Sequence, residues 1–247
     1  MKPAHLTPKK VNNGSSPTSK VHLPNCESLS KHKHVCIKNT LCILFAHILW
    51  YTVLVNAKTE RALYEIAEDQ GGYFSLSQAE SVGIQRNQIY RDVKRSKIER
   101  VYPGVYRLSL FPANQFEEIY AAVVSIGQEA VVGYETALYI YKLSDIIPSE
   151  IHIIVPRSSS RRRTHIRMHT NKLDEQDITN YEGFRITTVA RTLVDVLATH
   201  VSLEQVQLAI TQAISRGLTT PDELLIQAKK RSERIHNQME SLIKGKV

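Results

Sequence analysis

The chain has 247 residues, of which 42% are hydrophobic, which is enough for two packed domains or for one domain with extensions. Its formal net charge of +8 at pH 7 favours a polyanionic partner, although net charge says nothing about the fold. The three cysteines all precede residue 43 and lack metal-binding spacing, which argues against a disulfide framework and predicts no metal site.

The first 56 residues differ in composition from the rest of the chain. Residues 1–40 hold seven lysines and one acid, so they supply +6 of the total charge of +8. Residues 1–30 contain four prolines among Ser, Asn and Lys, and such a composition buries too little apolar surface to fold. We therefore predict that this extension begins with a disordered tail.

An almost unbroken apolar run, LCILFAHILWYTVLV, occupies residues 41–55. It is shorter than the roughly 20 residues of a membrane-spanning helix, and it lies too far from Met1 for a signal peptide. Three interpretations stay open. The physiological start lies further along, at a non-AUG codon near residues 53–55; the run is a short hydrophobic anchor or an added helix; or it has some other origin.

Residues 58–109 are predicted to form a winged helix-turn-helix. The predicted elements are helices at about 59–69, 76–82 and 86–96, and a strand–turn–strand at 98–109. The second helix follows Ser75-Leu76-Ser77-Gln78, a capping box in which both polar side chains can satisfy free backbone donors. Three helices followed by a hairpin is the winged-helix order.

Ala79, Gly83 and Ile89 have the spacing of a helix-turn-helix. The two helices of this motif cross closely, so the first needs a small residue and the second needs an apolar anchor. The turn between them needs a residue that adopts positive φ.

Positive charge is concentrated on the third helix and the hairpin. Between Gln85 and Arg107 there are seven cations and two acids, a balance of +5, whereas Lys58 to Glu80 has a balance of −3. The positive field is therefore strongest where DNA phosphates would lie.

Residues of two kinds are expected to contact DNA. Side chains that can reach base edges in the major groove are Gln85, Arg86, Asn87, Tyr90 and Arg91. Cations better placed for phosphates are Lys94, Arg95, Lys97, Arg100 and Arg107. The alternative is a solvated basic helix in a domain that binds protein.

Residues 115–240 mix helical and strand patterns, which predicts a mixed α/β C-terminal domain. The predicted helices lie near 115–126, 132–142, 188–199, 202–215 and 221–239, and the predicted strands near 151–155, 164–169 and 184–187. The fold class is thus α+β, with a winged helix-turn-helix followed by this domain.

A second basic patch consists of five arginines within eleven residues and no acid: Arg157, Arg161, Arg162, Arg163 and Arg167. It predicts either a second phosphate-binding surface or a solvated loop between strands, and both interpretations stay open.

The polar pattern at residues 187–195 has a structural interpretation. Thr188 can cap a helix, and Arg191 with Asp195 has the i, i+4 spacing of an ion pair. Glu135 is a further candidate partner for Arg191.

A cluster of acids at residues 174–177 lacks the strand context and the nearby lysine of a metal-dependent nuclease. We therefore predict that the protein is not an enzyme and uses no cofactor.

Five motifs occur in order: FSLSQAESVGI (74–84), IERVYPGVYRLS (98–109), GYETALYIYKLSD (133–145), IHIIVP (151–156) and GFRITTVARTLVDVLA (183–198). Together they resemble the AbiEi-like antitoxins and transcriptional regulators of type IV toxin-antitoxin systems. The resemblance runs from about Arg61 to Ala198, and the long N-terminal extension departs from the family pattern.

The resemblance implies a winged helix-turn-helix that binds double-stranded DNA at an inverted repeat in its own promoter, and a C-terminal domain required for antitoxin activity. It also implies a nucleotidyltransferase toxin that is countered without a stable complex. We therefore predict a cytoplasmic autorepressor that acts as an antitoxin in abortive infection, a phage defence. The alternatives are a nucleic-acid-processing protein that docks through the winged helix, and a membrane-tethered regulator.

Overall fold

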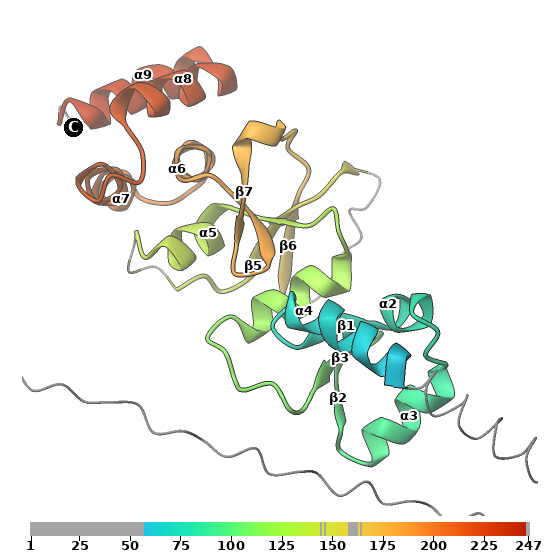
Figure 1. The fold of residues 1–247 in the computed structure, drawn as a ribbon. Helices are drawn as coiled ribbons and strands as arrows, with labels where there is room; N and C mark the ends of the chain where they lie inside the picture. Colours follow the sequence, from blue (N-terminus) through green and yellow to red (C-terminus); the bar gives the residue numbers. More distant parts are fainter. Residues whose placement is uncertain (1–56, 144, 146, 158–162, 164, 246–247) are drawn as a thin grey trace, which may run out of the picture. The chain divides into compact units, whose positions relative to one another are not determined.

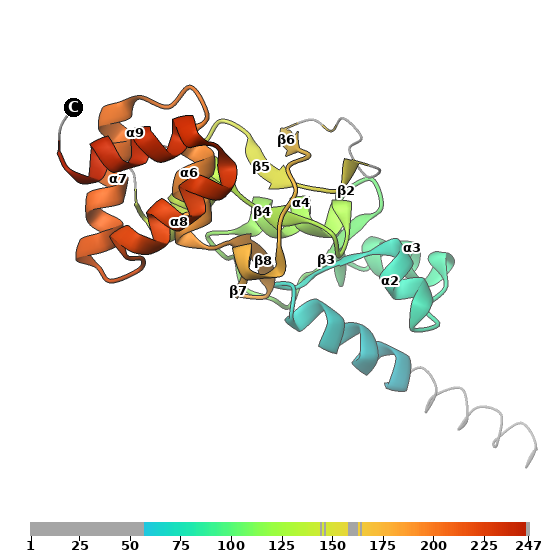
Figure 2. The same cartoon turned by 90° about the horizontal axis from the view of Figure 1, so that it is seen from above.

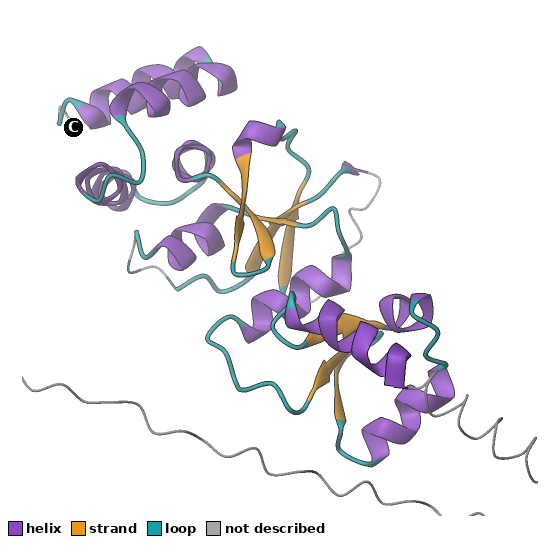
Figure 3. Ribbon diagram, in the orientation of Figure 1, coloured by secondary structure: helices purple, strands orange, loops and turns teal. Residues whose placement is uncertain are grey.

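The computed structural model describes residues 57–143, 145, 147–157, 163 and 165–245. All described residues belong to one compact unit. The N-terminal extension, with its apolar run and its cysteines, therefore lies outside the described residues. The described part is a mixture of helices and sheets, as predicted (Figure 3). None of its helices is both long and apolar enough to cross a membrane.

The first described elements are a helix over residues 57–68 and a small sheet with two further helices. These are β1 (Tyr73–Ser75), α2 (Leu76–Ser81), α3 (Arg86–Lys94), β2 (Ile98–Tyr102) and β3 (Val105–Leu108). The strands form an antiparallel sheet in the order β1-β3-β2. The three helices and the β2–β3 hairpin occur in the predicted order. Strand β1 was not predicted. It forms by pairing with β3, which follows both helices in the sequence.

An apolar core holds these elements together. Leu63 of the first helix, Ala79 of α2 and Ile89 of α3 are all buried in it. Phe74 of β1 and Tyr106 of β3 stack in the same core, with ring centroids 5.8 Å apart. Because full burial of a large apolar side chain stabilises by about 1.5–3 kcal/mol, this core fixes α3 against the helices and the sheet.

The remaining elements follow from residue 117. They are α4 (Glu117–Ile126), β4 (Val131–Val132), α5 (Tyr134–Tyr141), β5 (Ile151–Ile154), β6 (Ile166–His169), the 3-10 turn η2 (Glu175–Asp177), β7 (Ile178–Tyr181), β8 (Phe184–Thr187), α6 (Val189–Leu197), α7 (Leu203–Ser215), α8 (Pro221–Arg231) and α9 (Glu233–Ile243). The five strands form one mixed sheet in the order β6-β5-β4-β8-β7. Strand β4 is antiparallel to β5 and parallel to β8.

Helices α6 to α9 gather beside one another in both ribbon views (Figure 1 and Figure 2). They share a buried apolar core with residues of α5 and the sheet, including Leu138 and Ile154. The prediction of a single helix over 221–239 is wrong, because Ser232 interrupts it and separates α8 from α9. This residue has an extended conformation (φ −174°, ψ 157°), and its side chain caps α9 by accepting from the Ile235 backbone N–H.

The small sheet also shares a core with the five-stranded sheet. Tyr73 of β1 and Val105 of β3 belong to the same buried cluster as Phe116, Tyr120 and Phe184. The rings of Tyr73 and Tyr120 are stacked, with centroids 6.1 Å apart. The two sheets are thus joined by apolar packing as well as by the chain.

Candidate nucleic-acid interface

The three residues predicted for a helix crossing lie on α2, in the turn after it and on α3. Ala79 and Ile89 are completely buried, and Gly83 between the helices has φ +92°. A side chain strains the backbone at such a φ, so glycine fits this turn. The backbone N–H of Ile84 then donates to the carbonyl oxygen of Ala79 at 3.0 Å, which closes the turn.

The start of α2 is fixed by the predicted capping box. Ser75 Oγ accepts a hydrogen bond from the backbone N–H of Gln78 at 3.2 Å, and the Gln78 side chain accepts one from the backbone N–H of Ser75 at 2.8 Å. An N-cap of this kind contributes about 1 kcal/mol. The cap therefore determines where α2 begins and, through the turn, where α3 lies.

All five residues predicted to read bases are exposed on or next to α3: Gln85, Arg86, Asn87, Tyr90 and Arg91. Gln85 is the N-cap residue of α3, and the side chain of Tyr90 is 45% exposed. Arg86 lies 3.4 Å from a carboxylate oxygen of Glu80, and both side chains are exposed. Because an exposed pair contributes about 0–1 kcal/mol, Arg86 is available to a ligand.

Four of the five predicted phosphate contacts are exposed cations that form no ion pair with another described residue: Lys94, Arg95, Lys97 and Arg100. Lys94 is the last residue of α3, and Arg100 lies on β2. Together they extend the positive surface from the helix to the hairpin.

Arg107 is placed differently from the other four. Its side chain is only 13% exposed, and it lies 3.3 Å from Glu99 and 3.9 Å from Glu117. It also donates to the carbonyl oxygen of Phe111 at 2.8 Å, and its guanidinium lies over the Tyr73 ring. Arg107 thus connects the β2–β3 hairpin to the segment that follows it, at Phe111 and Glu117.

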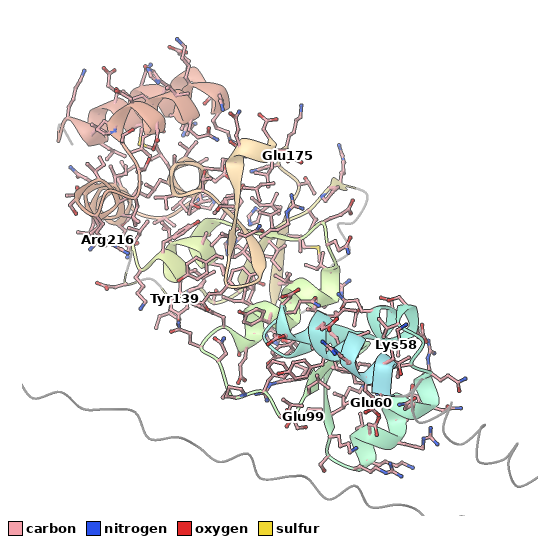
Figure 4. All side chains as sticks on the ribbon, in the orientation of Figure 1. Lys58, Glu60, Glu99, Tyr139, Glu175 and Arg216 are labelled. Atoms are coloured by element: carbon pink, nitrogen blue, oxygen red, sulfur yellow. The ribbon has the colours of Figure 1, made fainter. Side chains whose placement is uncertain are left out.

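A polar hollow of about 440 Å³ runs alongside α3 and contains both signs of charge. Arg91, Arg95 and Lys97 line it together with the carboxylates of Asp92 and Glu60. Glu60 belongs to the first helix, near its start (Figure 4). Sequence patterns assign Glu60 to an acidic stretch and give no sign that it lies beside α3. The positive field of α3 is therefore weaker on this side than on its outward face.

The second basic patch is only partly described. Arg157, Arg163 and Arg167 are exposed, and Arg167 lies on the edge strand β6. Arg161 and Arg162 lie outside the described residues.

A buried group of charges connects α6 to the 3-10 turn before β7. Arg191 donates through Nε to Asp195 at 2.7 Å and through Nη1 to Asp177 at 2.8 Å. Its third contact is to the carbonyl oxygen of Lys172, and Gln227 donates to the other oxygen of Asp177. The predicted Arg191–Asp195 pair is confirmed. Asp177, which is 14 residues away, has no local sequence signal as a partner.

Glu135 is not a partner of Arg191, so that prediction is wrong. Its carboxylate lies 2.7 Å from Nδ1 of His152, because α5 directs it toward β5. Burial opposes ionisation of Glu135, but the neighbouring His152 holds its pKa below the usual value. His152 Nδ1 also lies 3.3 Å from Nε2 of His169, whose ring stacks on Tyr134. This polar cluster lies between α5 and two strands of the sheet.

Residues 61–109 match the family model described as "Transcriptional regulator, AbiEi antitoxin". The match begins within the first helix and ends just after β3, so it covers α2, α3 and the hairpin. The resemblance in the sequence is confirmed over this segment. No curated protein matches the chain.

Proposed function

We propose that residues 58–109 form a winged helix-turn-helix in which α3 is the recognition helix and the β2–β3 hairpin is the wing. The order of the elements supports this assignment. So do the buried Ala79 and Ile89 and the positive φ of Gly83, which are what a close helix crossing requires. The family match covers the same elements.

The exposed face of α3 is the observation that carries the function, which is binding of double-stranded DNA. Arg86, Asn87 and Arg91 are exposed on α3 and offer hydrogen-bond donors of the kinds that contact base edges in the major groove. The free cations from Lys94 to Arg100 would contact phosphates on either side of the groove. Arg107 is not proposed as a phosphate contact, because its guanidinium is bound by Glu99 and by the carbonyl oxygen of Phe111.

The biological role proposed for this interface is transcriptional autorepression by the antitoxin of a type IV toxin-antitoxin pair. The description of the matching family supports a regulator that is also an antitoxin. Two copies would bind an inverted repeat in the protein's own promoter, since a palindrome matches a two-fold pair of proteins. Repression by occupancy needs no catalysis and no cofactor. The partner toxin would be a nucleotidyltransferase that is countered in the cytoplasm without a stable complex.

Binding of the full chain to its own upstream DNA, compared with scrambled DNA of equal length at two salt concentrations, tests this proposal. The double variant Arg86→Ala/Arg91→Ala should lose about tenfold or more in affinity for the upstream DNA, because one good base contact contributes about 1–3 kcal/mol. Lys229→Ala/Arg234→Ala removes the same charge from exposed positions on α8 and α9 and serves as the control. Equal binding to both DNAs, or equal losses in both variants, would contradict sequence-specific repression.

A further inference from the structure

A cavity of about 240 Å³ opens between the loop after β6, helix α6 and the last turn of α8. It lies far along the chain from the proposed recognition helix. The side chains that line it include four cations and two carboxylates. Its volume is below the roughly 300 Å³ at which pockets for drug-sized ligands begin, so it suits a small polar group.

The floor of this cavity is a buried network of hydrogen bonds around Arg191. Arg191, whose side chain is 9% exposed, is held by Asp177, Asp195 and the Lys172 carbonyl oxygen. Gln227 is buried and donates to the second oxygen of Asp177 at 2.8 Å. These groups fix one another, and the single positive charge of Arg191 faces two carboxylates, so the floor has a net negative charge.

The rim carries an excess of positive charge. Lys172, Lys230 and Arg231 are exposed and line the cavity, and none forms an ion pair with another described residue. Against these three cations stands one exposed carboxylate, Asp174, because Asp177 is occupied in the floor. The rim therefore has two more positive than negative charges, and the floor, where Arg191 faces both Asp177 and Asp195, reduces the excess of the whole site to about one.

We propose that this cavity binds the phosphate group of a phosphate monoester, held by Lys172, Lys230 and Arg231. A monoester carries about −1.5 to −2 charges at pH 7, which matches the excess of the rim. A monoester also presents three terminal oxygens, one for each rim cation, whereas a carboxylate or an internal phosphodiester presents only two. Arginine can bind a phosphate through two parallel hydrogen bonds, and lysine supplies a point charge. The phosphate belongs either to a small metabolite such as a nucleotide or to the 5′ end of an RNA.

The probe for this site is adenosine 5′-monophosphate, with adenosine as the ligand that lacks the phosphate, titrated into the full chain by calorimetry or NMR. The double variant Lys230→Ala/Arg231→Ala should weaken binding of the monophosphate by about tenfold or more, as expected for loss of charged hydrogen bonds. The control is Lys229→Ala/Arg234→Ala, which removes two exposed cations next to these positions that do not line the cavity. The control should bind within about twofold of the unchanged chain, since exposed charges contribute little.

A second pair of ligands distinguishes the sources of the phosphate. A short single-stranded RNA with a 5′-phosphate is compared with the same RNA bearing a 5′-hydroxyl, in a chain that also carries Arg86→Ala/Arg91→Ala to remove binding at α3. Tighter binding of the phosphorylated RNA than of both the hydroxyl RNA and the monophosphate assigns the site to RNA ends, and any other order assigns it to small phosphoesters. Equal binding of monophosphate and adenosine, or equal losses in both double variants, would overturn the proposal, whatever the outcome of the DNA experiment.

Discussion

His169 is half-buried at the end of β6, stacked on Tyr134 and close to His152. Burial lowers the pKa of His169 from its usual 6.5 to about 4, and the neighbouring His152 and Arg167 act in the same direction. In the unfolded chain the ring takes up a proton near its usual pKa. The unfolded state therefore binds more protons than the folded state between these two values.

The free energy of unfolding should consequently be largest above about pH 6.5 and fall as the pH decreases toward 4. Glu135 contributes to this loss only near and below its usual pKa of 4.5, because its own pKa is lowered. Urea denaturation at a series of pH values measures the slope. His169→Asn should flatten it, whereas His200→Gln, at an exposed position, should not. An unchanged slope in His169→Asn would assign the pH dependence to other groups.

Arg191→Ala should destabilise the protein by about 3–5 kcal/mol, because it leaves Asp177 and Asp195 buried without their cation. Burial already raises the pKa of Asp195, although Arg191 beside it acts in the opposite direction. Chemical denaturation at pH 7 measures the loss. The control is Arg61→Ala, which breaks an exposed i, i+4 pair with Glu65 and should cost less than about 0.5 kcal/mol. Comparable losses in the two variants would show that the buried network contributes no more than a surface pair.

The partners of Arg191 also show which contacts of a single residue can be predicted from the sequence and which cannot. The pair with Asp195 is local, because one helical turn brings the two side chains together. Asp177 reaches Arg191 only because η2 and α6 pack together, and Glu135 is directed away to His152 by the position of α5. Neither contact has a periodicity or a motif. In the same way, Arg107 counts as a free cation in the sequence but is bound by Glu99 and Phe111 in the fold.

At the scale of elements, Ser232 separates α8 from α9. Its extended backbone ends one helix, and its side chain caps the next at the backbone N–H of Ile235. Ser232→Ala should destabilise the protein by about 1 kcal/mol through loss of the cap. Thermal or urea denaturation measures this, with Ser215→Ala at an exposed position in the last turn of α7 as the control. A loss no larger than that of the control would mean that apolar packing alone sets the break.

Elements with a local signal were predictable, and those made by distant pairing were not. The capping box at Ser75, helix α3 and the β2–β3 hairpin follow from caps, periodicity and turn residues close together in the chain. Strands β1, β4 and β7 were not predicted. The first two have three and two residues, and β7 is an edge strand with two exposed central residues, so each is defined by its partner strand. The split between α8 and α9 was missed because the apolar pattern continues across Ser232.

At the scale of the whole molecule, Gly183 allows a close approach between the β7–β8 turn and the end of the first helix. A Cβ at this position would lie 1.9 Å from the carbonyl oxygen of Asp69, and the backbone has φ +87°. Gly183→Ala should therefore destabilise the protein by more than the roughly 1–2 kcal/mol expected from positive φ alone. Gly104→Ala is the matched control, because Gly104 has φ +81° and no atom within 4 Å of the added Cβ. Equal losses of unfolding free energy in the two variants would show that the backbone at Asp69 can shift away from the added Cβ without further destabilising the protein.

The apolar cluster that contains Tyr73, Val105, Phe116 and Phe184 limits how this gene can recombine during evolution. The segment that matches the regulator family ends at residue 109, before two of these four side chains. A gene fragment cut at that point would encode a sheet with an uncovered apolar face. Recombination could therefore not transfer the segment that ends at residue 109 to an unrelated protein unless the recipient supplied an equivalent surface. We therefore expect the segment up to residue 109 and the segment after it to evolve as one unit. Substitutions at Tyr73 should be accompanied by substitutions at Phe116 or Phe184.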